Sequence, residues 1–296
     1  MPEAAPPIQI LVGRAARVGT LSVQRVLPTR GHRTIGAWCF VDHMGPAVFG
    51  PGDGIAVAPH PHIGLQTVTW LFEGSAVHRD SLGSEQRIRP GQLSLMTAGA
   101  GIAHSEEDPD GPGGTVHGMQ FWIAQPAATR SGPSAFEHHQ DLPRIDFDHG
   151  SATVLVGRFS GSVSPARRDS DHVGVELDLR PGTTVLPLDP TYEHGLVVAS
   201  GALTVLGTGL APGAVAYLPP GAEELMVSSA DPARAVLIGG VPFTEDVTMW
   251  WNFVARNRDE LTDAYRDWVS DSGRFGPVHS SLPRVDVGPP PWLRAA

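Results

Sequence analysis

The sequence predicts an all-β fold, arranged as two tandem β-barrel domains with a C-terminal helix. Three observations support this prediction. The chain has 35 Gly and 28 Pro among its 296 residues, a composition that favours short strands joined by many turns. Short segments of alternating apolar residues recur between these turns. A helical pattern of apolar residues is confined to one segment near the C-terminus.

The predicted strands are short and lie between turn signals in both halves of the chain. Such spacing is typical of sandwiches and barrels rather than of folds in which helices alternate with strands. The predicted ranges are residues 67–72, 92–96, 116–124, 153–159, 174–179, 195–199, 202–206, 214–218 and 235–239.

Glycines at turns mark an internal repeat. In each half a glycine at the end of a strand is followed by a Pro-Gly pair and then by a further glycine, eight residues beyond that pair (Gly74, Gly91 and Gly99; Gly201, Gly213 and Gly221). The stretch between the first two glycines differs by five residues, which a surface loop tolerates. We therefore expect an N-terminal domain at 1–130, a polar linker at 131–143 and a C-terminal domain at 144–296.

One segment of the C-terminal domain has the pattern of a helix. Asn257 followed three residues later by Glu260 resembles a capping box, and Gly273 is the expected stop. We expect the apolar stripe of this helix to pack against a β-domain, and the Pro-rich run 283–291 to form an extended tail on the surface. The stripe consists of Leu261, Ala264, Tyr265 and Trp268.

Charge and cysteine content argue against several classes of protein. The 21 basic residues, all of them Arg, oppose 31 acidic residues, and the net charge of −10 disfavours binding to a nucleic-acid backbone. The single cysteine, Cys39, can form no intrachain disulfide, and the N-terminal segment lacks the features of a signal peptide, so we expect a cytoplasmic protein. The apolar stretches are too short for a transmembrane helix.

Two clusters of imidazole and carboxylate side chains predict a metal-binding site. One residue separates His60 from His62, and one separates His104 from Glu106. In an extended backbone, residues i and i+2 project from the same face. If the two strands face each other across a small barrel, three nitrogens and one oxygen converge and leave one or two coordination positions open. This donor set is typical of non-haem iron centres, and zinc, manganese, copper and nickel are also compatible with it.

The prediction rests on both clusters together, because 13 histidines make a single pair with this spacing unremarkable. His78 belongs to a His-Arg-Asp segment that we interpret as a turn, and His138 and His139 fall in the expected linker. We expect ordinary surface or core roles for these three and for His32, His43, His117, His149, His172, His194 and His279.

The motifs around these residues resemble those of the pirin family of the cupin superfamily. They are long and specific, and the likeness covers most of the chain. The motifs are HPHIGLQTVTWLFEG from His60, HRDSLG from His78, RPG from Arg89 and MTAGAGIAHSE ending at Glu106, with FVDH at Phe40, WWNFV at Trp250 and GRFG at Gly273 as further matches.

This resemblance implies a bicupin, with two jelly-roll barrels and iron in the N-terminal barrel. The residues that match the iron ligands of the family are His60, His62, His104 and Glu106, which makes one Fe(II) the expected cofactor. By the same resemblance, Gln120 on the strand at 116–124 is expected to bind substrate beside the open metal positions. Residues 63–67 read IGLQT where many members have RGFET, so a charged pair beside the metal is absent.

The repeat also predicts which positions of the C-terminal domain correspond to the four ligands. These counterparts are Pro187, Asp189, Met226 and Ser228, of which one is an ordinary metal ligand. We therefore expect this domain to be structural or to bind a partner. Glu193 and His194 are the residues that could form a metal site of a different kind.

Two functions are compatible with the sequence. The first is an oxidoreductase of the quercetin 2,3-dioxygenase type, which cleaves an aromatic small molecule such as a flavonol or a related enol or catechol. Glu106 then accepts the proton of the substrate hydroxyl, and a bound metal lowers the pKa of both groups. The second is a metal- or redox-sensing regulatory protein that binds a protein partner, as the resemblance to a family with a nuclear transcriptional co-regulator implies. A sugar isomerase fits the motifs less well.

Overall fold

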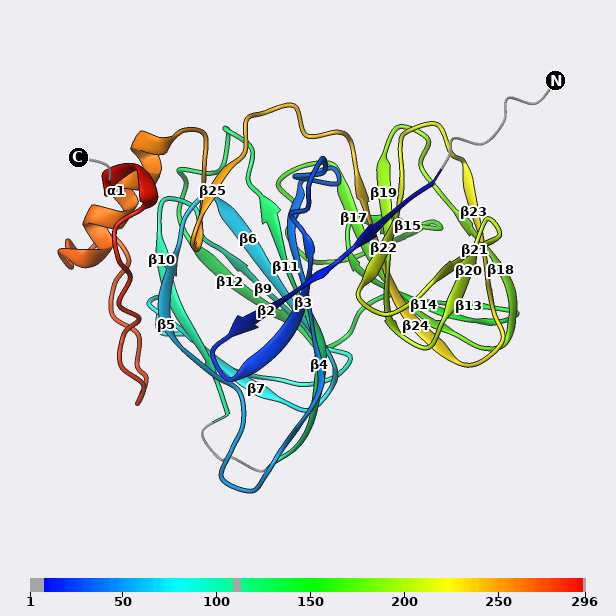
Figure 1. Cartoon of the computed structure of the whole chain (residues 1–296), viewed down its shortest axis with the longest axis horizontal. Helices are drawn as coiled ribbons and strands as arrows, with labels where there is room; N and C mark the ends of the chain where they lie inside the picture. Colours follow the sequence, from blue (N-terminus) through cyan, green and yellow to red (C-terminus); the bar gives the residue numbers. More distant parts are fainter. Residues whose placement is uncertain (1–7, 109–112, 295–296) are drawn as a thin grey trace. The chain divides into compact units, whose positions relative to one another are not determined.

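The chain folds into many short strands and, among the residues that the structure describes, a single α-helix (Figure 1). The computed structural model describes residues 8–108 and 113–294. The all-β prediction is confirmed, since each predicted strand overlaps an observed one and the helix lies near the C-terminus. No helix in these two ranges is long and apolar enough to span a membrane.

The first half of the chain contains twelve strands. Strands that are covered on both faces show the least alternation of buried and exposed residues. One of them, β12, falls within the segment 131–143 that we expected to be a linker, and it extends a sheet beside β9. The strands are β1 (Gln9–Val12), β2 (Arg14–Val18), β3 (Leu21–Leu27), β4 (Trp38–Phe49), β5 (Ala56–His62), β6 (Leu65–Glu73), β7 (Ala76–Asp80), β8 (Glu85–Ile88), β9 (Leu93–Thr97), β10 (Ile102–Glu107), β11 (Gly114–Ala124) and β12 (Ala135–His139).

The second half contains the remaining strands and both helical segments. These are β13 (Arg144–Phe147), β14 (Gly150–Val156), β15 (Arg158–Phe159), β16 (Ser162–Val163), β17 (His172–Leu179), β18 (Gly182–Pro187), β19 (Glu193–Ser200), β20 (Leu203–Val205), β21 (Thr208–Leu210), β22 (Ala214–Leu218), β23 (Glu224–Ser229), β24 (Ala233–Gly240), β25 (Thr248–Trp250), β26 (Phe253–Ala255), the helix α1 (Arg258–Val269) and the 3-10 turn η1 (Pro291–Leu293).

Sheet topology confirms the internal repeat. One four-stranded sheet has the order β5-β10-β7-β8, and another has the order β18-β23-β20-β21. Each half also contributes a seven-stranded sheet, with the order β12-β9-β6-β11-β4-β3-β2 in one and β1-β22-β19-β24-β17-β14-β13 in the other. The strands β4 to β11 therefore correspond one by one to β17 to β24.

The glycines that mark the repeat occupy equivalent turns. Gly74 has φ 89° and Gly201 has φ 73°, in the region that favours glycine. A Cβ atom on Gly74 would lie 2.7 Å from the carbonyl oxygen of Thr115, and one on Gly201 would lie 2.6 Å from that of Pro232. Both positions therefore need glycine for the same reason, which is a left-handed turn pressed against a neighbouring backbone.

The chain forms two compact units whose residues are not consecutive in sequence. The N-terminal unit contains residues 17–23, 44–138 and 244–294, and the C-terminal unit contains residues 8–16, 24–43 and 139–243. In the C-terminal unit, the indole of Trp38 donates to the carbonyl of Gly239 at 3.1 Å, and the Gly36 amide donates to the Glu193 carboxylate at 2.7 Å. We expected two domains that are each continuous in sequence. Instead, each unit combines segments that are separated in the sequence.

The helix α1 belongs to the N-terminal unit and begins where the sequence predicts. Asn257 caps it by accepting a hydrogen bond from the Glu260 amide at 3.0 Å. The helix ends at Val269, before the expected stop at Gly273, because Asp271 already adopts a left-handed φ of 54°. Its buried face packs in a cluster with residues of β26 and of the loop after β5, as expected for the apolar stripe.

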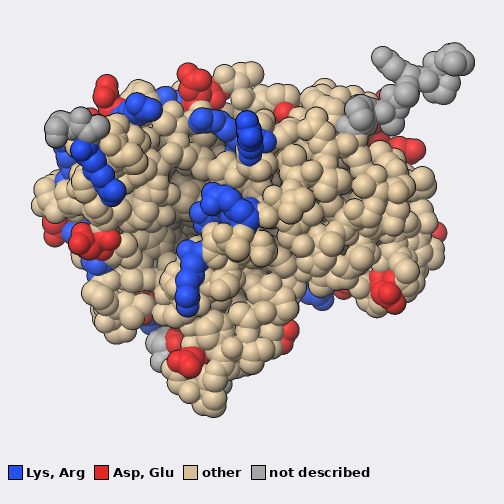
Figure 2. Space-filling view, viewed as in Figure 1, with Lys and Arg blue, Asp and Glu red and all other residues tan. Residues whose placement is uncertain are grey.

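Charged side chains are sparse on the surface. Figure 2 shows them singly or in small groups on one face, surrounded by uncharged residues. Since charged residues make up 18% of the chain and none is Lys, every basic side chain in that view is an arginine.

Candidate metal centre

The histidines of the two predicted clusters lie on neighbouring antiparallel strands of the N-terminal unit. His60 and His62 end β5, His104 lies on β10, and His60 is directly opposite His104 in the register. The expectation that the two strands face each other across a barrel is therefore wrong. Adjacent strands place these side chains even closer together, because directly opposed Cβ atoms in an antiparallel pair are about 5 Å apart.

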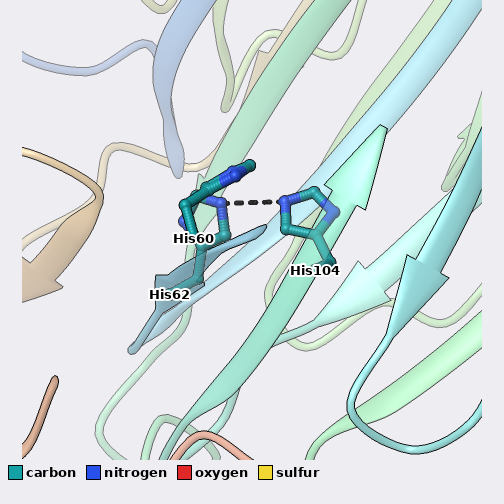
Figure 3. Close-up of side chains that lie close together, drawn as sticks. All are labelled: His60, His62 and His104. Atoms are coloured by element: carbon teal, nitrogen blue, oxygen red, sulfur yellow. Dashed lines mark hydrogen bonds between the residues drawn. The ribbon is translucent and has the colours of Figure 1, made fainter. Parts of the chain in front are cut away.

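Three imidazoles converge on one point (Figure 3). One potential ligand atom from each of His60, His62 and His104 lies within 4.8 Å of the others. The Nε2 atoms of His62 and His104 are 3.1 Å apart, as the dashed line in Figure 3 marks. All three residues are buried, with 1% of His62 and 2% of His104 exposed to solvent.

The hydrogen bonds at Nδ1 determine which nitrogen of each ring can bind a metal. Nδ1 of His60 donates to the carbonyl of Ala58 at 2.8 Å, and Nδ1 of His62 donates to that of Asn252 at 2.9 Å. A carbonyl can only accept, so both Nδ1 atoms carry the proton and both Nε2 atoms carry a lone pair. Donation from the second nitrogen to a fixed acceptor is typical of histidines that bind metals.

His104 is oriented by His78 and Asp80, which lie on strand β7 and not in the turn that we expected. Nδ1 of His104 lies 3.4 Å from Nδ1 of His78, whose Nε2 donates to Asp80 at 3.0 Å. Because the carboxylate holds the His78 proton at Nε2, Nδ1 of His78 accepts and Nδ1 of His104 donates. The His78 ring also stacks on Phe136 of β12, with centroids 4.2 Å apart.

This arrangement fits a divalent transition metal. Burial lowers the pKa of His60 to about 4 and holds the pKa values of His62 and His104 well below the ordinary value, so the three rings are uncharged at neutral pH. Neutral Nε2 lone pairs that face one another at 3.1 Å repel unless a cation lies between them. Imidazole nitrogens suit iron, nickel, copper and zinc.

Glu106, the fourth predicted ligand, lies nearby but is not part of the 4.8 Å group. The register of β10 shifts between His104 and Glu106, so a β-bulge separates the two side chains. The hydroxyl of Thr69 lies within hydrogen-bonding distance of Glu106 Oε1, at 2.9 Å. Burial raises the pKa of the Glu106 carboxyl, and the Thr69 hydrogen bond opposes that effect. Metal binding by Glu106 stays a prediction.

Gln120 points into the same space from β11. It is directly opposite Thr69 in the register, and its Oε1 lies 2.9 Å from the Thr69 hydroxyl. A threonine has one hydroxyl hydrogen, so Thr69 donates to either Gln120 or Glu106 at a given moment. Trp122, two residues further on the same face, contacts His62 edge to face with centroids 5.2 Å apart. Gln120 and Trp122 therefore lie on the face of β11 that is turned towards Thr69 and His62, and the substrate-binding role of Gln120 stays a prediction.

Gln66 belongs to the segment IGLQT, in which the sequence resemblance pointed to the absence of a charged pair. Its side-chain amide donates to the Thr97 hydroxyl at 3.0 Å, and the residue is fully buried. A neutral amide can be buried in this way without a cationic partner, and Ile63 of the same segment is buried as well.

The C-terminal unit has different residues at the corresponding positions. Met226 is 51% exposed on β23, and Leu225 and Val227 point inward instead. Asp189 accepts hydrogen bonds from the amide and hydroxyl of Thr191, at 2.9 and 2.6 Å. Among the described residues, one group of three closely spaced metal-binding side chains is found, and it consists of His60, His62 and His104.

Comparisons with known proteins match both halves of the chain. The family model for pirin matches residues 20–123, and the model for the pirin C-terminal cupin domain matches residues 174–276. The chain is 37% identical over 286 residues to a pirin-like protein of Caulobacter vibrioides, covering 93% of this chain and 95% of that one.

Two further relatives are named for an enzymatic activity. A Pseudomonas aeruginosa protein named "Putative quercetin 2,3-dioxygenase" is 45% identical over 289 residues, which cover 96% of this chain and 91% of the relative. A crystal structure of quercetin 2,3-dioxygenase from Acinetobacter baumannii matches with a TM-score of 0.93 and 42% identity, over 96% of each chain. From the two family models and the identity to these relatives over nearly its full length, the chain belongs to the pirin family, with an N-terminal pirin domain and a C-terminal pirin cupin domain.

Proposed function

We propose that the protein is a metal-dependent dioxygenase of the quercetin 2,3-dioxygenase type. The observation that carries the proposal is the convergence of three neutral imidazole lone pairs in the N-terminal unit. The names of the relatives from Pseudomonas aeruginosa and Acinetobacter baumannii support the choice of reaction. Fe(II) is the metal that we propose, and Ni, Mn, Cu and Zn are alternatives that elemental analysis distinguishes.

The metal would be held by Nε2 of His60, His62 and His104. Three protein ligands would leave coordination positions open, and a metal held there would supply Lewis acidity and redox chemistry. The backbone carbonyls of Ala58 and Asn252 keep two of the rings in the tautomer that binds metal. The protein thus provides a rigid, preformed set of donors, which lowers the cost of organising the site.

Glu106 is the residue that we propose as the base. A flavonol carries a hydroxyl beside a carbonyl, and loss of the hydroxyl proton makes it electron-rich enough to react with O2. The carboxylate of Glu106 accepts that proton, and burial makes it a stronger base than an exposed glutamate. Thr69 can then rotate its hydrogen between Glu106 and Gln120, so the hydrogen-bond network adapts to both protonation states.

Turnover of quercetin by metal-loaded protein tests this proposal. We expect oxygen-dependent loss of quercetin absorbance in the wild type, and a loss of rate of at least about 100-fold in Glu106→Gln. Metal content is measured in the same samples, because unchanged metal affinity assigns Glu106 as a base and a lower affinity assigns it as a ligand. The matched control is Glu85→Gln, which changes a glutamate whose side chain is 58% exposed on β8.

Two results would contradict the proposal. If Glu106→Gln keeps both its metal and the wild-type rate, Glu106 is not the base. If metal-loaded wild type consumes neither quercetin nor O2, and a panel of other flavonols and catechols gives the same result, the dioxygenase proposal is wrong. The regulatory alternative, a metal- or redox-sensing protein that binds a protein partner, would then be favoured.

A further inference from the structure

The C-terminal unit contains a cavity that has no part in the site described above. Its volume is about 520 Å³, within the range of roughly 300–1,000 Å³ that is common for small-molecule sites. Residues of β15, β17 and β19 line it, together with Leu237 of β24 and residues 187–190, which comprise the end of β18 and the start of the following loop.

The repeat shows that this cavity corresponds to the space beside the metal centre. Thr69 is opposite Gln120 in the N-terminal unit, and Leu196 is opposite Leu237 in the C-terminal unit. Since Leu196 lies 127 residues after Thr69, as Gly201 lies 127 after Gly74, Leu237 is the counterpart of Gln120. The predicted counterparts of His60 and His62, which are Pro187 and Asp189, line the cavity too. The C-terminal unit therefore has a cavity at the corresponding place, lined by different residues.

The walls now combine apolar side chains with acids that already have partners. Phe159, Leu188 and Leu237 are buried and form an apolar surface. Asp171 accepts a hydrogen bond from the Tyr192 hydroxyl at 2.7 Å and forms an ion pair with Arg168 at 2.9 Å. Asp189 likewise accepts from the amide and hydroxyl of Thr191. Neither carboxylate needs a ligand to satisfy it.

The guanidinium of Arg158 has no such partner. Arg158 lines the cavity from the start of β15, and among the described residues it forms no ion pair or side-chain hydrogen bond. A guanidinium offers five N–H donors in a planar fork that matches a carboxylate. His194, which is 2% exposed and lines the same cavity, adds an imidazole that burial keeps uncharged, with a pKa of about 4. The hydrogen-bonding groups of this cavity that remain available to a ligand are therefore donors, the N–H groups of Arg158.

We propose that the cavity binds a small organic acid, with its carboxylate on Arg158 and its apolar body against Phe159, Leu188 and Leu237. An inorganic anion would leave the apolar walls uncovered, and a neutral apolar molecule would make no hydrogen bond with the N–H donors of Arg158. The proposal is independent of the proposed dioxygenase activity, because no residue of the metal centre belongs to the cavity.

Fluorine NMR of the full chain labelled with fluorotyrosine tests the proposal. The chain has three tyrosines, of which Tyr192 lines the cavity and Tyr265 lies on α1 in the N-terminal unit. The probes are benzoate, phenylacetate and hexanoate, each compared with its neutral amide. We expect at least one acid to shift the Tyr192 signal while Tyr265 stays unchanged, equally in metal-loaded and chelator-treated protein. The signal is assigned with Tyr192→Phe.

Substitution of the cation provides the control. Arg158→Gln changes an exposed side chain, so the variant should fold, and we expect it to weaken binding of the acid by about tenfold or more. Arg144→Gln, which changes an exposed arginine on β13 of the same unit, should bind the acid as the wild type does. The proposal is overturned if no acid shifts Tyr192, if an amide binds as tightly as its acid, or if Arg158→Gln leaves the affinity unchanged.

Discussion

Each imidazole of the candidate metal centre is held through its Nδ1 atom. His60 and His62 use backbone carbonyls at Nδ1, whereas His104 uses a second imidazole that is itself held by Asp80. A backbone carbonyl cannot be removed by mutation, but a side chain can. The His78 and Asp80 pair is therefore the part of this support that mutation can test.

Asp80→Asn should weaken metal binding by about 10- to 100-fold, the usual effect of losing an outer hydrogen bond to a metal ligand. The physical reason is that an asparagine amide no longer fixes the His78 tautomer, so Nδ1 of His104 loses a defined acceptor. Competition with a coloured chelator measures the affinity. Asp53→Asn, at an exposed position of the same unit, serves as the control, and equal affinities for both variants would contradict the prediction.

Loss of a ligand should have a larger effect on metal than on fold. We expect one transition metal per wild-type chain by elemental analysis, and loss of that metal in His62→Ala or His104→Ala. Circular dichroism should stay native-like, since a chain of this size has a core that does not depend on a metal. Two metals per chain, or full occupancy in both variants, would argue against a site built on these histidines.

Stability should depend on pH through His172 in the C-terminal unit. Burial, with Arg168 adding to it, lowers the pKa of His172 to about 4 from an ordinary 6.5. Between these values the unfolded chain binds a proton that the folded chain does not. The free energy of unfolding therefore falls as the pH drops from 6.5 towards 4, by up to about 1.4 kcal/mol per pH unit for this residue.

Urea denaturation between pH 7 and pH 5 measures this dependence. Other groups titrate over the same range, so the comparison that matters is between wild type and His172→Gln. The variant should lose less stability on acidification than the wild type. An equal loss in both proteins would show that His172 is not responsible.

At the scale of elements, every range predicted from alternating apolar residues overlaps a strand, but β5 and β10, which carry the histidines, were not among the predicted ranges, and alternation did not predict which strands are neighbours. The predicted ranges 67–72 and 195–199 lie within β6 and β19, whereas the adjacency of β5 and β10 depends on the pairing of His60 with His104, 44 residues further along the chain. The strand β7 was missed because His78-Arg-Asp80 is polar throughout. The available signal was the same i, i+2 spacing as in the ligand pairs, with Arg79 between two buried residues.

The helix was predictable because its signals are local. Asn257→Ala should lower stability by about 1 kcal/mol, since the Glu260 amide then loses its acceptor at the helix N-terminus. Asn257→Asp keeps an acceptor and should stay close to the wild type. Thermal unfolding measures both variants, and an Asn257→Ala variant as stable as Asn257→Asp would show that the cap does not contribute.

For the whole molecule, the fact that each unit combines segments separated in the sequence has a consequence for truncation. Residues 244–294 belong to the unit that holds the metal centre, where Phe253 and Trp268 pack with Ile63 and Ala103. A fragment of residues 1–130 lacks these partners and should neither fold stably nor retain metal. Elemental analysis and size-exclusion chromatography check this. A monomeric fragment that binds metal as tightly as the full chain would contradict the prediction.

The acceptor for His62 is the carbonyl of Asn252, 190 residues further along the chain. Ribosomes add about 5–20 residues per second, so roughly 10 to 40 s pass between the synthesis of these two residues. From the synthesis of His104 onward, the nascent chain contains all three histidines, but until Asn252 is added it lacks the group that orients one of them. The complete geometry of the site, with His62 held at Nδ1, therefore cannot form until the chain has been synthesised at least as far as Asn252.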